Sequence, residues 1–168
     1  MQADRKFGNV YNLPLALTCC DPGIWAMANI LVVDDDPAVQ MTIRLLLERA
    51  GHRVAVAADG RKGLATFEAG NFDLLFLDIF MPGMDGIETM RLVHQQRPDV
   101  PIIVISGRPI ITDADAEPDF LTMAMKLGAI SSLPKPFKPA ALLATVAACL
   151  EAAKRSSSPQ GRGAASSP

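Results

Sequence analysis

The sequence predicts an α/β protein in which helices cover both faces of a parallel β-sheet. Short apolar runs recur five times along the chain, at residues 30–33, 54–57, 74–77, 102–105 and, more weakly, 130–133. Runs that are apolar at every position and bounded by turn residues are typical of strands buried on both faces. Longer segments with apolar residues at helical spacing follow each run. This alternation indicates repeated β-α units around a parallel sheet.

The predicted helices have recognisable start and stop residues. Asp36 and Pro37 suit the N-cap and first position of a helix over residues 37–50, and Gly51 suits its end. The other predicted helices span residues 61–69 after Asp59, 86–96 after Asp85, 120–127 before Gly128, and 139–152 from Pro139.

Length and composition indicate one globular domain with a sizeable core. The chain has 168 residues, 49% of them apolar, with a mean hydropathy of +0.22 and a net charge of −2. These values argue against bulk disorder and against a general nucleic-acid binder. The longest uncharged apolar stretch, residues 140–150, is too short to span a bilayer. Three cysteines, two of them adjacent, form no disulfide framework and fit a reducing cytoplasm.

The pattern divides the chain into three segments. Residues 28–153 hold the periodic structure, with sixteen acidic and eleven basic residues and so a net charge of −5. Residues 1–27 have weak periodicity and are interpreted either as an irregular extension or as residues upstream of a natural start at Met27. Residues 154–168 are rich in Ser, Pro, Gly and Ala and are predicted to be disordered.

Polar residues follow the apolar runs at the points where the strands are expected to end. Asp34 and Asp35 come directly after the first run, Asp78 after the third and Ser106 after the fourth; Lys135 lies two residues beyond the fifth. In an open parallel sheet, ligands bind at the carboxyl ends of the strands. We therefore expect these five side chains to converge at one edge.

Three converging carboxylates require a compensating cation. An all-oxygen set with one or two direct carboxylates suits Mg²⁺, which keeps several of its waters. An Asp carboxylate is also a competent nucleophile toward phosphoryl groups, and Mg²⁺ with Lys135 would neutralise charge on the phosphoryl oxygens. Ser106 would donate a hydrogen bond there, and Gly107 leaves space and a backbone N–H. The residues thus predict an Mg²⁺-dependent site of aspartyl phosphorylation.

At these residues the chain resembles the receiver domain of two-component response regulators. The matching motifs are ILVVDDDP at residues 30–37, LLFLDIFMPGMDG at 74–86, PIIVISG at 101–107 and LPKPF at 133–137. The resemblance covers residues 28–153 and implies the doubly wound, flavodoxin-like (βα)5 fold with strand order 2-1-3-4-5. It also implies a phosphoacceptor signalling protein, not an enzyme, that catalyses only its own aspartyl phosphorylation and dephosphorylation.

The resemblance assigns a phosphoacceptor and a set of metal ligands. Asp78 aligns with the phosphoacceptor, which also contacts the metal. Asp35 aligns with the direct metal ligand, and Asp34 aligns with the acid that acts on the metal through water. The backbone carbonyl of Phe80 aligns with the usual third protein ligand.

The resemblance also assigns phosphoryl contacts and a switch. Lys135 aligns with the phosphoryl-binding lysine, and the backbones of Ile79 and Gly107 align with phosphoryl contacts. Ser106 aligns with the hydroxyl that moves toward the phosphoryl group on activation. Ser132 stands where the family often has an aromatic residue that rotates inward, so the aromatic half of the switch is absent.

The implied function is that of a single-domain response regulator in the cytoplasm. A sensor histidine kinase or a phosphotransfer protein would supply the phosphoryl group, and a conformational change would alter binding of an unidentified downstream protein. No room for an output domain follows Leu150, and neither direct nucleic-acid binding nor membrane binding is expected. The chain is expected to be a monomer, or a weak dimer through the face formed by the fourth helix, fifth strand and fifth helix.

Two other functions stay open. One is a receiver used as an interaction module regardless of phosphorylation, for which Ser132 in place of the aromatic leaves room. The other is an Mg²⁺-dependent phosphohydrolase of the haloacid-dehalogenase type, but that family needs a second Asp where Phe80 stands. Among the residues outside the site, His52 is predicted at the surface and Cys149 in the core.

Overall fold

The computed structural model describes residues 27–107 and 124–157, which form a five-stranded parallel sheet flanked by helices. The strands are β1 (Asn29–Val33), β2 (Arg53–Ala57), β3 (Leu74–Asp78), β4 (Ile102–Ser106) and β5 (Ser131–Pro134). The helices are α1 (Pro37–Arg49), α2 (Gly60–Ala69), α3 (Gly86–Gln96) and α5 (Pro139–Ser157). The strand order is β2-β1-β3-β4-β5 with parallel pairing throughout, so the predicted order 2-1-3-4-5 is confirmed.

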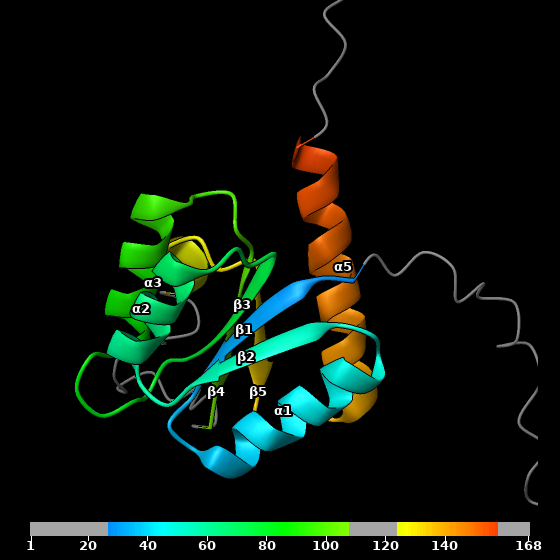
Figure 1. The fold of residues 1–168 in the computed structure, drawn as a ribbon, viewed down its shortest axis with the longest axis horizontal. Coiled ribbons are helices and arrows are strands. Elements are labelled where there is room, and N and C mark those ends of the chain that lie inside the picture. The colour runs from blue at the N-terminus through cyan, green and yellow to red at the C-terminus, as the bar shows by residue number, and fades with distance from the viewer. Residues whose placement is uncertain (1–26, 108–123, 158–168) are drawn as a thin grey trace, which may run out of the picture.

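Helices cover both faces of the sheet. Figure 1 shows α2 and α3 on one side and α1 and α5 on the other. Successive side chains of a strand point to opposite faces, so β1 directs Leu31 and Val33 toward α2 and α3 and Ile30 and Val32 toward α1 and α5. All four side chains are fully buried. Burial on both faces explains why the central strands are apolar at every position.

The predicted helix caps are confirmed. Each of three aspartates precedes a helix and accepts a backbone N–H of its first turn at 2.7 or 2.8 Å, Asp36 from Ala38, Asp59 from Lys62 and Asp85 from Glu88. At the other end of α1, Gly51 has a φ of 91°, which a side chain would strain. Its amide donates to the Glu48 carbonyl at 3.0 Å, so the helix ends where the sequence predicted.

The last helix is longer than the sequence predicted. It continues through Ser157, so residues 154–157 of the segment predicted to be disordered are helical. Residues 151–155 are strong helix formers, and Lys154 and Arg155 interact favourably with the negative end of the helix dipole. The helix predicted over residues 120–127 lies mostly outside the described residues, which begin again at Ala124.

The prediction that His52 lies at the surface is wrong. Its side chain is only 6% exposed, and Nδ1 accepts a hydrogen bond from the Ala28 amide at 3.4 Å. The residue lies between the end of α1 and the start of β2, beside Ala28. Burial lowers the pKa of His52 because the interior disfavours the charged imidazolium. Cys149, by contrast, lies in the core as predicted.

An arginine joins the ends of α2 and α3. Arg97, which follows α3, donates from one guanidinium nitrogen to the Phe67 carbonyl at 2.6 Å and to the Gly70 carbonyl at 2.9 Å. Its Cζ atom lies 3.8 Å from the centre of the Phe67 ring. The guanidinium thus satisfies carbonyls at the end of α2 and stacks on an aromatic face at the same time.

Candidate phosphoacceptor and metal site

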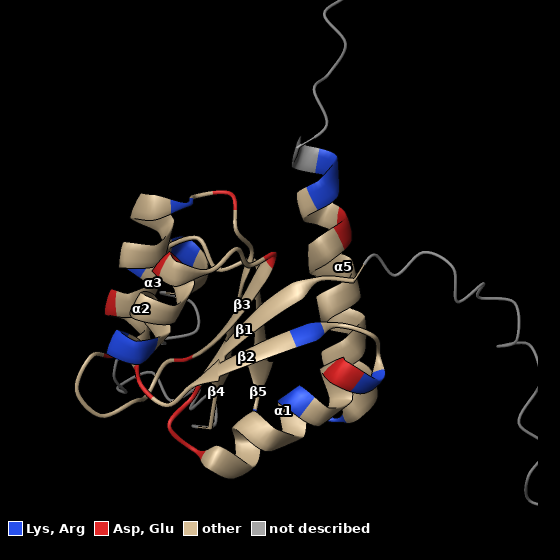
Figure 2. Ribbon diagram, viewed as in Figure 1, with Lys and Arg blue, Asp and Glu red and all other residues tan. Residues whose placement is uncertain are grey.

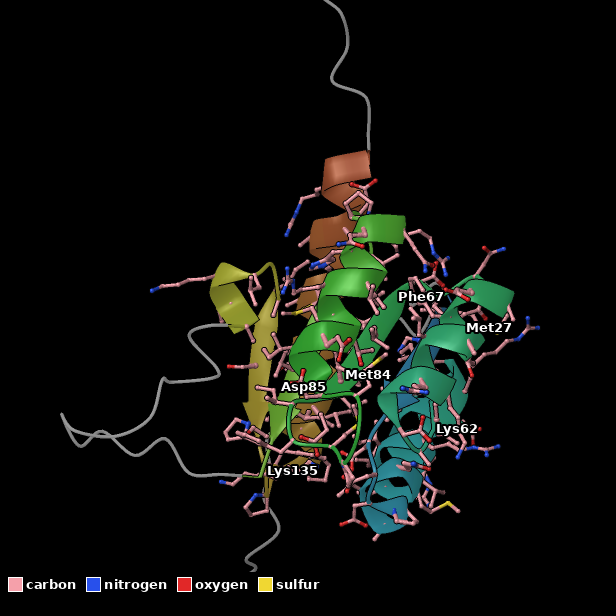
Figure 3. The ribbon with its side chains drawn as sticks, turned by 90° about the vertical axis from the view of Figure 1, so that its left-hand side faces the viewer. Met27, Lys62, Phe67, Met84, Asp85 and Lys135 are labelled. Atoms are coloured by element: carbon pink, nitrogen blue, oxygen red, sulfur yellow. The ribbon has the colours of Figure 1, made fainter. Side chains whose placement is uncertain are left out.

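The five polar residues expected to converge lie at the carboxyl ends of the strands. Asp34 and Asp35 follow β1, Asp78 ends β3, Ser106 ends β4 and Lys135 follows β5. Figure 2 shows the acidic segment between β1 and α1 at this edge of the sheet. In Figure 3, Lys135 lies at the same end of the molecule as the β3–α3 loop that carries Met84 and Asp85.

Lys135 joins two of the carboxylates. Its Nζ lies 2.7 Å from Asp78 Oδ2 and 2.7 Å from Asp34 Oδ2, and its side chain is 16% exposed. Burial alone would lower the pKa of Lys135, but hydrogen bonds and charge from the two carboxylates outweigh it and raise the pKa. The ammonium therefore stays charged, and it ties β5 to the ends of β1 and β3.

Asp34 forms hydrogen bonds through both its backbone and its side chain. Its backbone N–H donates to the Ala57 carbonyl at 3.1 Å, and its Oδ1 accepts the Asp36 amide at 2.9 Å. The side chain is fully buried, and burial raises the pKa of Asp34 more than Lys135 and the Asp36 amide lower it. An acid this buried is retained in its charged form only when cations face it.

The three carboxylates fit a divalent cation. One oxygen each from Asp34, Asp35 and Asp78 lies within 4.8 Å of the others. Asp34 Oδ2 is buried and faces the Lys135 ammonium, 2.7 Å away, in an ion pair. Three carboxylates and one ammonium leave a local charge of −2, which one Mg²⁺ balances. Oxygen-only ligands with room for water are also what Mg²⁺ prefers, so the donor set fits the ion.

The phosphoacceptor candidate is buried and hydrogen-bonded to a backbone neighbour. Asp78 is 4% exposed, and its Oδ1 accepts the Phe80 amide at 3.2 Å. The Ile79 amide donates to the Ile105 carbonyl at 3.2 Å, so a contact from Ile79 to a phosphoryl group would have to share or break that bond. The metal-binding role of the Phe80 carbonyl and the phosphoryl contact of Ile79 stay predictions.

The ends of β4 and β5 place Ser106 and Lys135 next to each other along the backbone. The Lys135 amide donates to the Ser106 carbonyl at 2.7 Å, and Ser106 is 3% exposed. Among the described residues, a Cβ added at Gly107 would meet the Lys135 Cδ at 3.7 Å, which is an ordinary van der Waals contact. Gly107 therefore lies beside the Lys135 side chain, where the sequence predicts a phosphoryl group.

Ser132 lies on the face of the sheet that α2 and α3 cover. Leu133 packs in the cluster with α1 and α5, so the preceding residue points to the opposite face. Ser132 is half-buried and pairs with Val104 of β4. A small hydroxyl side chain therefore stands at the position that the resemblance assigned to the aromatic half of the switch.

The loop after the phosphoacceptor depends on a glycine. A Cβ at Gly86 would overlap the Asp78 carbonyl oxygen, and the Gly86 amide donates to the Ile79 carbonyl at 3.0 Å. The start of α3 therefore packs directly against the backbone of Asp78. Any larger residue would displace the backbone of Asp78 or the helix.

Sequence reasoning missed Gln40. Its side-chain Nε2 donates to the Asp34 carbonyl at 2.6 Å and to the Ala57 carbonyl at 3.3 Å. A signal was present, because Gln40 precedes the buried Ile43 by three residues and the buried Leu47 by seven. It is a polar residue on the apolar stripe of α1, next to the acidic pair.

Comparisons with known proteins show the family to which this chain belongs. A profile of the response regulator receiver domain matches residues 30–147. Response regulator MprA of Mycolicibacterium vanbaalenii is 37% identical over 121 residues, which cover 72% of this chain and 49% of that protein. The C4-dicarboxylate transport transcriptional regulatory protein DctD of Pseudomonas aeruginosa is 37% identical over 127 residues, 75% of this chain and 26% of that protein. The chain belongs to the response regulator receiver domain family of two-component systems.

Solved structures give the same family. The CheY-like receiver domain of Methanospirillum hungatei has a TM-score of 0.70 and 30% identity, and the match covers 78% of this chain and 99% of that one. Chemotaxis protein CheY4 of Vibrio cholerae has a TM-score of 0.66 and 32% identity, covering 74% and 99%. The chain spans about half or less of the curated relatives named above, so its interpretation as a stand-alone regulator stays a prediction. No helix in the described ranges is both long and apolar enough to cross a membrane.

Proposed function

We propose that this receiver accepts a phosphoryl group on Asp78 in an Mg²⁺-dependent reaction, with a sensor histidine kinase or a phosphotransfer protein as the donor. The observation that carries the proposal is the Lys135 ammonium, 2.7 Å from carboxylate oxygens of both Asp34 and Asp78. One oxygen each of Asp34, Asp35 and Asp78 also lies within 4.8 Å of the others. A nucleophile, a cation and an acidic metal set therefore lie together at one edge of the sheet.

The residues of this site have different roles in phosphoryl transfer. The Asp78 carboxylate attacks phosphorus, the P–N bond of the donor phosphohistidine breaks, and the imidazole leaves with its electron pair. Asp34, Asp35, Asp78 and the Phe80 carbonyl would hold Mg²⁺, which supplies charge neutralisation at the phosphoryl oxygens. Lys135 can turn its ammonium from Asp78 Oδ2 toward a phosphoryl oxygen with little movement, because it already lies beside the acceptor.

Signalling follows from the change of partners at Lys135 and Ser106. Once Asp78 carries a phosphoryl group, Lys135 pairs with the new anion and the Ser106 hydroxyl turns toward it. This exchange shifts the population toward a conformer that binds a downstream protein differently, by no more than its differential stabilisation of the two conformers. We place this activity in the cytoplasm, where the free thiol of Cys149 is stable.

The interaction-module alternative rests on Ser132. A half-buried serine offers no ring to rotate, so the face around β5 has less to change on phosphorylation. The test is partner binding by the parent chain and by Asp78→Asn, each with and without a phosphodonor. If the parent chain binds its partner with the same affinity in both conditions, as Asp78→Asn does, the module is favoured.

The direct test is mass spectrometry of the intact chain. The protein is incubated with Mg²⁺ and a small acyl or amido phosphodonor, and we expect the mass of one added phosphoryl group. We expect no added phosphoryl group when EDTA replaces Mg²⁺ or when the chain carries Asp78→Asn. Asp85→Asn is the matched control, because it removes a carboxylate from the same β3–α3 loop and keeps an N-cap oxygen for the Glu88 amide. No added phosphoryl group, or one that survives Asp78→Asn, overturns the proposal.

A further inference from the structure

Asp35 has no side-chain support of its own. It is exposed, and within the described residues its carboxylate makes no hydrogen bond or ion pair. Asp34, its neighbour, is held through its amide, its carboxylate and its carbonyl. The direction of the Asp35 side chain is therefore set by the backbone that leads into it, above all by the peptide unit between residues 34 and 35.

The Gln40 side chain holds that peptide unit. Its Nε2 donates to the Asp34 carbonyl at 2.6 Å, which is a short hydrogen bond for an amide donor. The same nitrogen donates to the Ala57 carbonyl at 3.3 Å, and that carbonyl also accepts the Asp34 amide at 3.1 Å. One amide group thus joins β1, β2 and the first turn of α1 at the point where the acidic pair begins.

We propose that Gln40 is a positioning residue for the metal site, which holds the Asp34–Asp35 peptide so that both carboxylates face the cation. This inference rests on the proposed function, since it assigns Asp35 as a direct ligand of Mg²⁺. Partners that orient metal ligands are worth a substantial part of metal affinity, even though they do not touch the ion. Without the Gln40 bonds the peptide rotates more freely, and Asp35 loses its preferred direction toward the cation.

The test separates the metal site from the stability of α1. Gln40→Met keeps the length of the side chain and its lack of charge but removes both N–H donors. Gln40→Asn keeps the amide but is one methylene too short to reach both carbonyls. Thr42→Val is the matched control, because Thr42 Oγ1 bonds to the Ala38 carbonyl on the same helix and has no contact with Asp34.

Mg²⁺ affinity is measured by calorimetry on the full chain, and the rate of Asp78 phosphorylation is measured as a function of Mg²⁺ with a small phosphodonor. We expect Gln40→Met and Gln40→Asn to weaken Mg²⁺ binding about three- to tenfold, with Thr42→Val unchanged. The maximal phosphorylation rate at saturating Mg²⁺ should match the parent, because the ligands themselves remain. A merely structural role would lower the melting temperature and leave this concentration dependence unmoved.

Where the parent chain binds Mg²⁺, two results overturn the inference. One is parental Mg²⁺ affinity in Gln40→Met and Gln40→Asn, and the other is an equal loss of affinity in Thr42→Val. If the parent chain itself does not bind Mg²⁺, the proposed metal site fails and the inference fails with it. Parental binding with unaffected Gln40 variants overturns the role of Gln40 alone.

Discussion

Replacing Asp35 by Asn is expected to stabilise the protein without Mg²⁺ and to destabilise it relative to the parent with Mg²⁺. Without the ion, Asp35 faces two carboxylates, Asp34 and Asp78, and only one ammonium, that of Lys135. The repulsive pairs therefore outnumber the attractive pair by one. Removing the charge removes this imbalance and leaves the shape of the side chain unchanged.

The size of the effect follows from the separation of the carboxylates. Two unit charges 4.8 Å apart repel by about 1 kcal/mol at the dielectric constant of water and by about 3 kcal/mol at an effective value of 20. Asp35 is exposed, so the lower figure applies. We expect Asp35→Asn to raise the free energy of unfolding in EDTA by about 1 kcal/mol, or the melting temperature by about 3 to 5 °C.

Magnesium reverses the order of stability. A ligand at a hundredfold excess over its dissociation constant stabilises the folded state by about 2.7 kcal/mol. The parent gains this amount, whereas Asp35→Asn, without the direct ligand, gains little. Under saturating Mg²⁺ the parent should therefore be more stable than the variant by about 2 kcal/mol, which is the difference between the two effects.

Urea denaturation in EDTA and in Mg²⁺ measures both effects. Asp36→Asn is the matched control, because it removes the adjacent charge but keeps an N-cap oxygen for the Ala38 amide. The control should gain as much from Mg²⁺ as the parent does. A variant that is less stable than the parent in EDTA refutes the electrostatic argument, and equal stabilisation of variant and parent by Mg²⁺ refutes the assignment of Asp35.

Three further predictions concern other parts of the fold. Lys135→Met should lower the free energy of unfolding in EDTA by about 3 kcal/mol, because it leaves two buried carboxylates without their cation. Saturating Mg²⁺ should restore much of that loss in the same denaturation assay. Equal losses with and without Mg²⁺ would count against this prediction. His52 has a lowered pKa, so the unfolded chain binds a proton at this residue more readily than the folded chain does. The contribution of His52 to the free energy of unfolding should therefore be constant above about pH 6.5 and fall as the pH drops below it. His52→Asn should flatten this pH dependence in melting curves. Arg97→Lys should lower the free energy of unfolding by about 2 kcal/mol, because an ammonium replaces neither the forked hydrogen bonds nor the stacking on Phe67, while calorimetric Mg²⁺ binding stays unchanged.

Local sequence was sufficient for the architecture. Strands buried on both faces must be apolar at every position, so β1, β3 and β4 were visible as continuous runs. Cap residues act within one turn, which is why Asp36, Asp59 and Asp85 marked the helix starts correctly. The convergence of Asp34, Asp78 and Lys135 also followed from the sequence, because the carboxyl ends of parallel strands lie at one edge.

The tertiary structure decided what depends on contacts between distant segments. Sequence did not show that His52 is covered, because its burial arises where β2 returns beside Ala28. It did not show that Arg97 reaches back to the end of α2, twenty-seven residues away from Gly70. It also did not show that Gln40 bridges the carbonyls of Asp34 and Ala57.

The sequence by itself determined which residues form the acidic cluster, because strand ends and charges are local features. Only the tertiary structure decided how those residues are held, since Lys135 reaches Asp78 across fifty-seven positions of the chain and Gln40 reaches Ala57 across seventeen. Pairings at such separations depend on the twist and spacing of the whole sheet. The sequence therefore predicted which residues converge at this edge of the sheet, and the fold supplied the contacts that hold them.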